Sequence, residues 1–386
     1  MRIHLAGLLA CAACSAGASS GAPAPSPAAG GAASFDYLIG VSSESGDIIS
    51  WVRPGPGSLA VERVVPVGIM PADIDGPHNV TMAPDHKSYY VSVAHGTPHG
   101  TLWRMDARAD TLLGRATLEY YPTTIALTPD GELAFVANSD FFGDRPRRNP
   151  VSVVQTAAME KIADITACDM PHGVKVNRAG TKVYVTCMHS DELLEIDVST
   201  FEIARRARTG TATPTGGGDH AAHEAGSPPA ATATATAAAH DAGACAPTFV
   251  SVSPDDRTLY VACNTKNTLQ VWDAETLAQT REIAVGKGAY NVEASPDGAW
   301  LIVTNKKDRS VSLVDASSLE EVERIATTKP IVHGVAWSPD GRYAYISQES
   351  VGADPGAVDM IDVAARRVVA TVPLPAQPTG ITIQRR

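Results

Sequence analysis

The sequence has little positive charge and few aromatic residues. Lys and Arg number 31 against 42 Asp and Glu, so the formal net charge is −11, and Phe, Trp and Tyr make up 5% of the chain. Binding to nucleic acid requires a basic surface, so this composition argues against a nucleic-acid partner. A negative charge of this size mainly favours solubility and carries no information about the fold.

Long apolar runs and familiar catalytic motifs are also missing. The apolar run at residues 5–10 is too short to cross a bilayer as a helix. No Gly-rich phosphate loop, GxSxG elbow or paired-carboxylate spacing stands out. Neither an HExxH zinc motif nor a CxxCH haem-attachment motif is present. These absences argue against a recognisable hydrolase.

The first residues resemble an export signal, because Arg2 precedes the apolar run and small residues follow it. The order Leu-Leu-Ala-Cys at residues 8–11 resembles a bacterial lipobox, in which Cys11 carries the lipid. The alternative is an ordinary signal peptide that is cut at a small residue. Residues 12–34, rich in Ala, Gly, Ser and Pro, predict a flexible tether. We expect an exported monomer, periplasmic or anchored at the outer membrane, that meets the membrane only through its lipid.

One structural unit recurs along the chain. The tetrapeptide SPDG occurs at residues 295–298 and 338–341, and its variants TPDG, SPDD, APDH and NRAG start at residues 128, 253, 83 and 177. Pro presets φ and Gly tolerates positive φ, so these are tight turns. Alternating apolar runs flank each turn, and an Asp-led turn joins two further runs. Four short antiparallel strands, repeated every forty to fifty residues or so, are typical of a β-propeller blade.

Seven such units can be counted, and together they close a ring. The seventh ends the chain after one strand, TGITIQRR, and three runs within residues 35–68 supply its missing strands. Closure of this kind removes exposed sheet edges. The expected fold of residues 35–386 is therefore all-β, a seven-bladed β-propeller. The units start at residues 77, 122, 171, 247, 289, 332 and 378.

The motifs YVTC, YVAC, IVTN and FVAN, together with SPDG and VDASSL, resemble the YVTN-repeat family of seven-bladed β-propellers. The resemblance covers residues 35–386 apart from one insertion. It implies the propeller fold and says little about activity, because the family includes binding proteins, proteins of unknown role and relatives of amine dehydrogenase heavy chains. Cys187 and Cys263 stand where the family usually has Asn.

Strand direction divides the loops between two faces. The loops before strand one share a face with the links between strands two and three, and we call it the upper face. Its loops are long and dissimilar, whereas the lower turns are short and alike, so binding is expected on the upper face. The longest loop, residues 208–246, has a low-complexity composition that predicts disorder. Its His220, His223 and His240 are an alternative, loose metal chelator.

Four cysteines occupy matching places in two neighbouring units. Two of them precede strand one and two end strand two. These strand ends are neighbours at the upper face, and export favours disulfides, so we predict the pairs Cys168–Cys187 and Cys245–Cys263. The alternative is a copper site of soft ligands, formed by Cys168, Cys187, Met188, His172 and His189.

The second residue of each unit start is expected to ring the upper mouth of the central channel. Three converging imidazoles would bind copper or zinc and leave a coordination position open. The alternative is that small or hydrogen-bonding residues simply suit this mouth. The candidate metal ligands are His78, His172 and His333. The other four positions, which are candidate ligand-binding residues, are Thr123, Thr248, Tyr290 and Thr379.

Three functions are consistent with this sequence. The first is a binding scaffold of the cell envelope, whose upper face takes a small molecule or a protein. The second is a copper- or zinc-dependent protein, such as an oxidoreductase, that uses the three histidines. The third, by analogy of fold alone, is a lactonase- or lyase-like enzyme. Converged histidines favour the second, splayed histidines the first, and a deep pocket with a paired acid and base the third.

Overall fold

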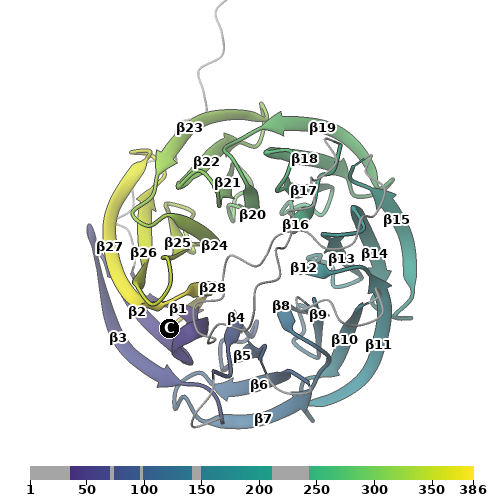
Figure 1. Ribbon diagram of the computed structural model, residues 1–386, viewed down its shortest axis with the longest axis horizontal. Helices are drawn as coiled ribbons and strands as arrows, with labels where there is room; N and C mark the ends of the chain where they lie inside the picture. The colour runs from purple at the N-terminus through teal and green to yellow at the C-terminus, as the bar shows by residue number, and fades with distance from the viewer. Residues whose placement is uncertain (1–34, 70–73, 96–98, 141–148, 211–242) are drawn as a thin grey trace, which may run out of the picture. The chain divides into compact units, whose positions relative to one another are not determined.

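A computed structural model describes residues 35–69, 74–95, 99–140, 149–210 and 243–386. Every strand belongs to the unit Ala33–Arg386, in which seven four-stranded antiparallel sheets stand around a ring (Figure 1). The predicted seven-bladed β-propeller is confirmed. The predicted signal peptide with Cys11, the tether and most of the insertion, including its three histidines, lie outside the described residues.

Six blades follow the order of the chain, each with its first strand innermost. Blade 1 consists of β4 (Pro77–Met82), β5 (Ser88–Val93), β6 (Thr101–Asp106) and β7 (Leu112–Thr117). Blade 2 consists of β8 (Pro122–Leu127), β9 (Leu133–Asn138), β10 (Asn149–Gln155) and β11 (Glu160–Cys168). Blade 3 consists of β12 (Pro171–Val176), β13 (Lys182–Cys187), β14 (Glu192–Asp197) and β15 (Ile203–Arg208). Blade 4 consists of β16 (Pro247–Val252), β17 (Thr258–Cys263), β18 (Thr268–Asp273) and β19 (Ala278–Ala284). Blade 5 consists of β20 (Ala289–Ala294), β21 (Trp300–Asn305), β22 (Ser310–Asp315) and β23 (Glu320–Ala326). Blade 6 consists of β24 (Ile331–Trp337), β25 (Tyr343–Glu349), β26 (Pro355–Asp362) and β27 (Arg367–Ala376).

Blade 7 joins the two ends of the described chain, as predicted. Its innermost strand β28 (Pro378–Arg385) pairs antiparallel with β1 (Tyr37–Ser43), so that Ile383 stands opposite Ile39. The blade continues through β2 (Ile48–Gly55) and β3 (Ser58–Pro66). A single 3₁₀ turn, η1 (Glu44–Gly46), links β1 to β2. Among the described residues, no helix has the length and apolar character that crossing a membrane requires.

The predicted lower turns form as their sequences dictate. In the turn after β20, Gly298 takes φ +73 and its N–H donates to the carbonyl of Ser295 at 2.9 Å. The Asp297 carboxylate accepts from the Ser295 hydroxyl and from the N–H of Ala299. The side chain therefore completes a turn that the left-handed glycine makes sterically possible.

The start of each first strand, at the upper face, differs in backbone geometry from the rest of the strand. In most blades the strand pairing shifts register there, as between Pro171 and Val174 in blade 3. Such β-bulges bend a strand and redirect its side chains. The residue just before the strand also takes positive φ in six of the blades, namely at Gly76, Tyr121, Met170, Ala246, Gly288 and Gln377.

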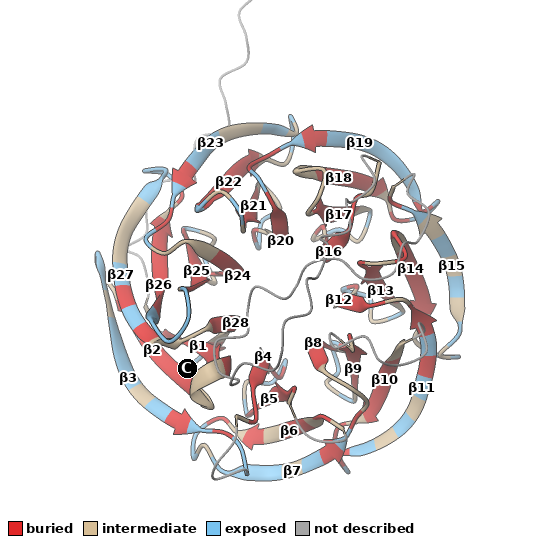
Figure 2. Ribbon diagram, in the orientation of Figure 1, coloured by how far each residue is buried: buried red, intermediate tan, exposed pale blue. Residues whose placement is uncertain are grey.

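The hydrophobic core lies between blades rather than in one centre. Seven clusters of buried residues occur, each shared by two neighbouring blades. Between blades 7 and 1, for example, Trp51 packs edge-on against Tyr89, with ring centroids 5.2 Å apart. The inner strands are largely buried and the outermost strands are largely exposed (Figure 2). This packing holds the inner strands rigidly around the central channel.

Candidate functional site

All seven residues at the predicted channel-mouth positions are buried. The three threonines hold blades together, since each hydroxyl donates to the carbonyl at the same position of the next blade. These bonds run from Thr123 to His172 (3.3 Å), from Thr248 to Tyr290 and from Thr379 to His78 (2.7 Å). The threonines therefore have a structural role, and their contact with a ligand stays a prediction.

The three predicted histidines converge, although they come from blades 1, 3 and 6. The ring centroid of His78 lies 5.7 Å from that of His333 and 6.3 Å from that of His172. Tyr290 joins them, with its ring centroid 4.8 Å from His333 and 5.5 Å from His172. We call these four residues, together with Glu44, His95 and Tyr121, the axial cluster.

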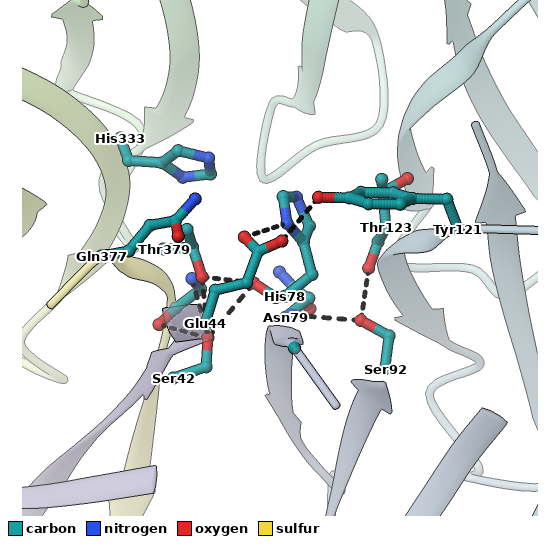
Figure 3. A network of polar contacts seen from close by, with 12 residues as sticks. Ser42, Glu44, His78, Asn79, Ser92, Tyr121, Thr123, His333, Gln377 and Thr379 are labelled. Atoms are coloured by element: carbon teal, nitrogen blue, oxygen red, sulfur yellow. Dashed lines mark hydrogen bonds and ion pairs between the residues drawn. The ribbon is translucent and has the colours of Figure 1, made fainter. Parts of the chain in front are cut away.

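Glu44 is the anchor of the axial cluster on the side of blade 7. Its Oε2 lies 2.9 Å from Nδ1 of His78, and its Oε1 lies 2.9 Å from Nε2 of His95 and accepts from the hydroxyl of Tyr121 at 2.5 Å. Figure 3 shows the carboxylate between His78 and Tyr121, with His333 nearby. Three donors thus surround one carboxylate that is only 2% exposed.

The electrostatics of Glu44 follow from these contacts. Burial by itself would raise the pKa of Glu44. The attraction to His78 and the hydrogen bonds from His78 and His95 outweigh burial, so its pKa lies well below the ordinary value. The axial cluster therefore contains a buried carboxylate that stays ionised, with an imidazole N–H fixed against it.

Tyr290 is the second hub of the axial cluster. Its hydroxyl oxygen lies 3.1 Å from Nε2 of His172 and 3.2 Å from Nε2 of His333. Burial, with the nearby Glu349 and Glu44 charges, raises the pKa of Tyr290 well above its ordinary value, so the phenol keeps its proton. Burial also lowers the pKa of His333 well below its usual range, helped by Lys306, so this imidazole is neutral.

The histidine tautomers in this chain of hydrogen bonds can be assigned from the acceptor atoms. Nδ1 of His172 lies 3.1 Å from the carbonyl oxygen of Thr248, which only accepts, so the proton of a neutral His172 is on Nδ1. Its Nε2 then accepts from the Tyr290 hydroxyl. The phenol oxygen in turn accepts from Nε2–H of His333, which leaves Nδ1 of His333 with a lone pair. That nitrogen has no hydrogen-bond partner among the described residues.

Three charged residues occupy one equivalent position in blades 5, 6 and 7. In each blade a hydroxyl on the second strand accepts from a backbone N–H of the first strand, at 2.8 to 2.9 Å. The charged residue follows two places later. The hydroxyls belong to Thr304, Ser347 and Ser42, and the charged residues are Lys306, Glu349 and Glu44. Lys306 Nζ lies 3.2 Å from Glu349 and 4.2 Å from the ring centroid of Tyr290.

These three charged residues and Tyr121 were not among the site residues predicted from the sequence. The signal was available, because aligning the seven repeats on the strand-two hydroxyl would have shown charge at one position of three consecutive blades. His95 lies in the upper loop between β5 and β6. The structure places it against Glu44.

Both predicted disulfides are present, Cys168–Cys187 and Cys245–Cys263. Their sulfur atoms are bonded to each other and are not free thiolates. His189 lies toward Asp169, with Nδ1 3.6 Å from the carboxylate oxygen. The alternative copper site built on the first cysteine pair is therefore wrong.

Among the described residues, no three His, Cys, Asp or Glu side chains are arranged to hold a metal ion. The reason lies in the hydroxyl of Tyr290, at which both His172 and His333 direct their Nε2 atoms. A ready three-histidine centre is thus not formed, although the three rings lie close together. Binding of copper or zinc by these residues stays a prediction.

Comparison with known families gives a partial match. The model of the cytochrome D1 heme domain family matches residues 234–333 and 301–384, which is less than half of the chain. No curated protein matches the sequence.

Solved structures confirm the architecture. Hydrazine synthase from Kuenenia stuttgartiensis is 20% identical over 82% of this chain and 93% of its own, with a TM-score of 0.61. A functionally unknown protein from Desulfotomaculum acetoxidans is 12% identical over 90% of this chain and 98% of its own, with a TM-score of 0.68. At such low identity the likeness shows the fold alone. The findings support a seven-bladed propeller family, and the narrower YVTN-repeat resemblance stays a prediction.

Proposed function

We propose that this protein is a binding β-propeller whose ligand is a transition-metal ion, held at the axial cluster with His78 as the first ligand. One observation carries the proposal. His78 is 6% exposed, its Nδ1 is fixed by Glu44, and its Nε2 has no hydrogen-bond partner among the described residues. Buried polar atoms normally have partners, and metal-binding histidines normally anchor their other nitrogen on a carboxylate or carbonyl.

Glu44 positions His78 for this task. By accepting from Nδ1–H it selects the tautomer with a lone pair on Nε2, and it raises the basicity of that nitrogen. His95 and Tyr121 donate to the same carboxylate and restrict its rotation. The ligating nitrogen is therefore oriented before any ion arrives, which lowers the entropic cost of binding.

The matched family name mentions a heme, but the histidine rings of the axial cluster already lie close to one another, and we propose a smaller ligand. The His78 ring lies only 5.7 Å and 6.3 Å from the two facing imidazoles, both nearly perpendicular to it. We therefore propose a single ion, copper or zinc, for which imidazole is a suitable donor.

We also propose that the protein works in the cell envelope. The two disulfides support this location, because such bonds persist in oxidising compartments. The export signature at residues 1–11 points the same way. A tethered propeller would present its metal site to the surrounding compartment.

The proposal is tested by equilibrium dialysis of the untagged full chain against copper(II) or zinc(II), with metal content measured by mass spectrometry. We expect one ion per chain in the wild type and loss of that ion in His78→Ala. The matched control is His86→Asn, which changes a histidine of a lower turn at φ +57, where Asn is tolerated.

A second variant, in which His220, His223 and His240 are all alanine, removes the histidines of the insertion. It is expected to keep the stoichiometric ion. The proposal is wrong if the wild type binds no ion, or if His78→Ala binds as much as the wild type.

A further inference from the structure

We propose that the outer edge of blade 7 is a docking surface for a second copy of this chain. The strand β3 of each copy pairs antiparallel with the other about a two-fold axis, so that Val61 stands opposite Val64 of the partner subunit. This inference involves neither the axial cluster nor a metal ion, and it replaces the monomer that was expected from the sequence.

The strand β3 is an open edge. It is the last strand in the order β28-β1-β2-β3, and among the described residues no further strand pairs with it. Figure 2 shows β3 on the outside of the ring, exposed over most of its length. The outer edge of such a strand offers backbone N–H and C=O groups to a strand of another chain.

Two exposed valines of β3 share one face of the sheet. Val61 is 41% exposed and Val64 is 48% exposed. Residues three apart in a regular strand point to opposite faces. Here a β-bulge intervenes, because Val52 stands opposite Val61 and Trp51 stands opposite Arg63, so that Glu62 is skipped. The bulge brings both valines to the same side of the blade.

This arrangement makes β3 complementary to itself. Residues that stand directly opposite each other in an antiparallel pair lie on the same face, and a two-fold interface requires that each contact occur twice. With Val61 opposite Val64 of the partner subunit, four valines gather on one face. The same register places Glu62 opposite Arg63 of the partner subunit, so unlike charges meet at the centre.

The other outer strands show how such edges are normally protected. Charged side chains and proline at a sheet edge oppose pairing with another chain. The exposed residues of β19 include Arg281 and Glu282, those of β23 include Glu323 and Arg324, and β27 exposes Pro373. The strand β3 presents its two valines instead.

The neighbouring blade extends the apolar surface. Its outer strand β7 exposes Leu112 by 45% and Leu113 by 52%. Blades 7 and 1 lie side by side in the ring (Figure 1). Exposed apolar side chains that gather in one region of a surface mark interaction sites, so the apolar part of the rim is centred on the proposed docking edge.

The first test is sedimentation velocity of the full chain over a range of concentrations. The background Cys11→Ala/Cys14→Ala removes the lipidation site and leaves only the four disulfide-bonded cysteines. We expect a concentration-dependent dimer that is weakened at least tenfold by Val64→Lys, because a lysine on an edge strand opposes pairing. The matched control is Ile162→Lys, which changes a 45% exposed residue of the outer strand β11 and is expected to dimerise as the parent does.

The second test checks the register by mixing Val61→Cys with Val64→Cys in the same background. Opposed residues of antiparallel strands lie within the Cα separation of about 4.4–6.8 Å that a disulfide needs. We expect a mixed disulfide under mild oxidation. Either variant alone is expected to give none, because its two equivalent cysteines are three residues apart along the strands, about 10 Å.

Each outcome decides the proposal. A chain that stays monomeric at every concentration overturns it. A dimer that gives no mixed disulfide overturns it as well, because another surface or another register then forms the contact. If Val64→Lys fails to fold, the parent chain and the mixed disulfide still decide the question.

Discussion

Nδ1 of His78 lies 2.9 Å from Oε2 of Glu44, and this contact joins the first strand of blade 1 to the blade that closes the ring. Glu44 follows β1, whose pairing with β28 brings the two ends of the propeller together. Closure of the ring and orientation of the candidate ligand therefore depend on the same segment.

The contact predicts the effect of Glu44→Gln. The amide removes the charge that fixes the Nδ1–H tautomer of His78, and loss of such a partner typically lowers metal affinity about 10- to 100-fold. Calorimetric titration with copper(II) measures the change. Glu293→Gln, which changes a partly exposed carboxylate paired with Lys175 at 2.6 Å, is the control and is expected to bind as the wild type does. Equal affinities in Glu44→Gln and the wild type would contradict the positioning role.

Stability is expected to fall on acidification. The pKa of folded Glu44 lies below its ordinary value of 4.5, so its stabilisation is present above that pH and is lost as the pH falls through the lowered folded value. His333, whose burial lowers its pKa, adds a loss that begins as the pH falls below 6.5. Urea unfolding at a series of pH values is expected to show a steeper acid loss in the wild type than in Glu44→Gln. Parallel curves would refute this linkage.

The variant Thr379→Val tests whether Thr379 has a structural role or a ligand-binding role at the channel mouth. The variant deletes the hydroxyl that donates to the His78 carbonyl at 2.7 Å, and a hydrogen bond of this kind contributes about 1 kcal/mol. We expect a loss of that size in the free energy of unfolding, with copper affinity unchanged. A large loss of affinity at unchanged stability would instead make Thr379 a ligand-binding residue.

Each disulfide is expected to stabilise the protein by about 3 kcal/mol in the loop-entropy model, because the two bonds span 19 and 18 residues. Chemical denaturation of Cys168→Ser/Cys187→Ser and of Cys245→Ser/Cys263→Ser measures the two effects separately. If either double variant unfolds at the same denaturant concentration as the wild type, that bond contributes nothing to stability.

Lipidation at Cys11 is expected to decide where the protein is found. If the lipobox is used, the wild type partitions with membranes and incorporates a labelled fatty acid, whereas Cys11→Ala does neither. Fractionation and labelling of cells that produce the full chain test this. A wild type recovered entirely in the soluble fraction without label would support the ordinary signal peptide.

The sequence was sufficient for the fold because the repeat is local. Turns such as that at Gly298 need their own Pro, Asp and Gly, and the count of unit starts required blade 7 to be shared between the two ends. The cysteine pairs followed from the same register. Each of these inferences used only the repeat and its register.

The site was predicted only in part, because its contacts are not local. His78, His172 and His333 were identified because the repeat places them at one position, and the structure brings their rings together. The role of Tyr290 depends on a hydroxyl that reaches two other blades, and Glu44 meets His78 only after ring closure. Contacts across the channel join residues of distant repeats, so aligning the repeats identifies equivalent positions but does not predict which residues meet.

Anomalous X-ray diffraction from crystals of the copper-loaded protein tests the central claim most directly. The account predicts one strong copper peak per chain, about 2 Å from Nε2 of His78. A peak confined to other histidines, such as His86 or His189, or no ordered copper at all, would contradict it.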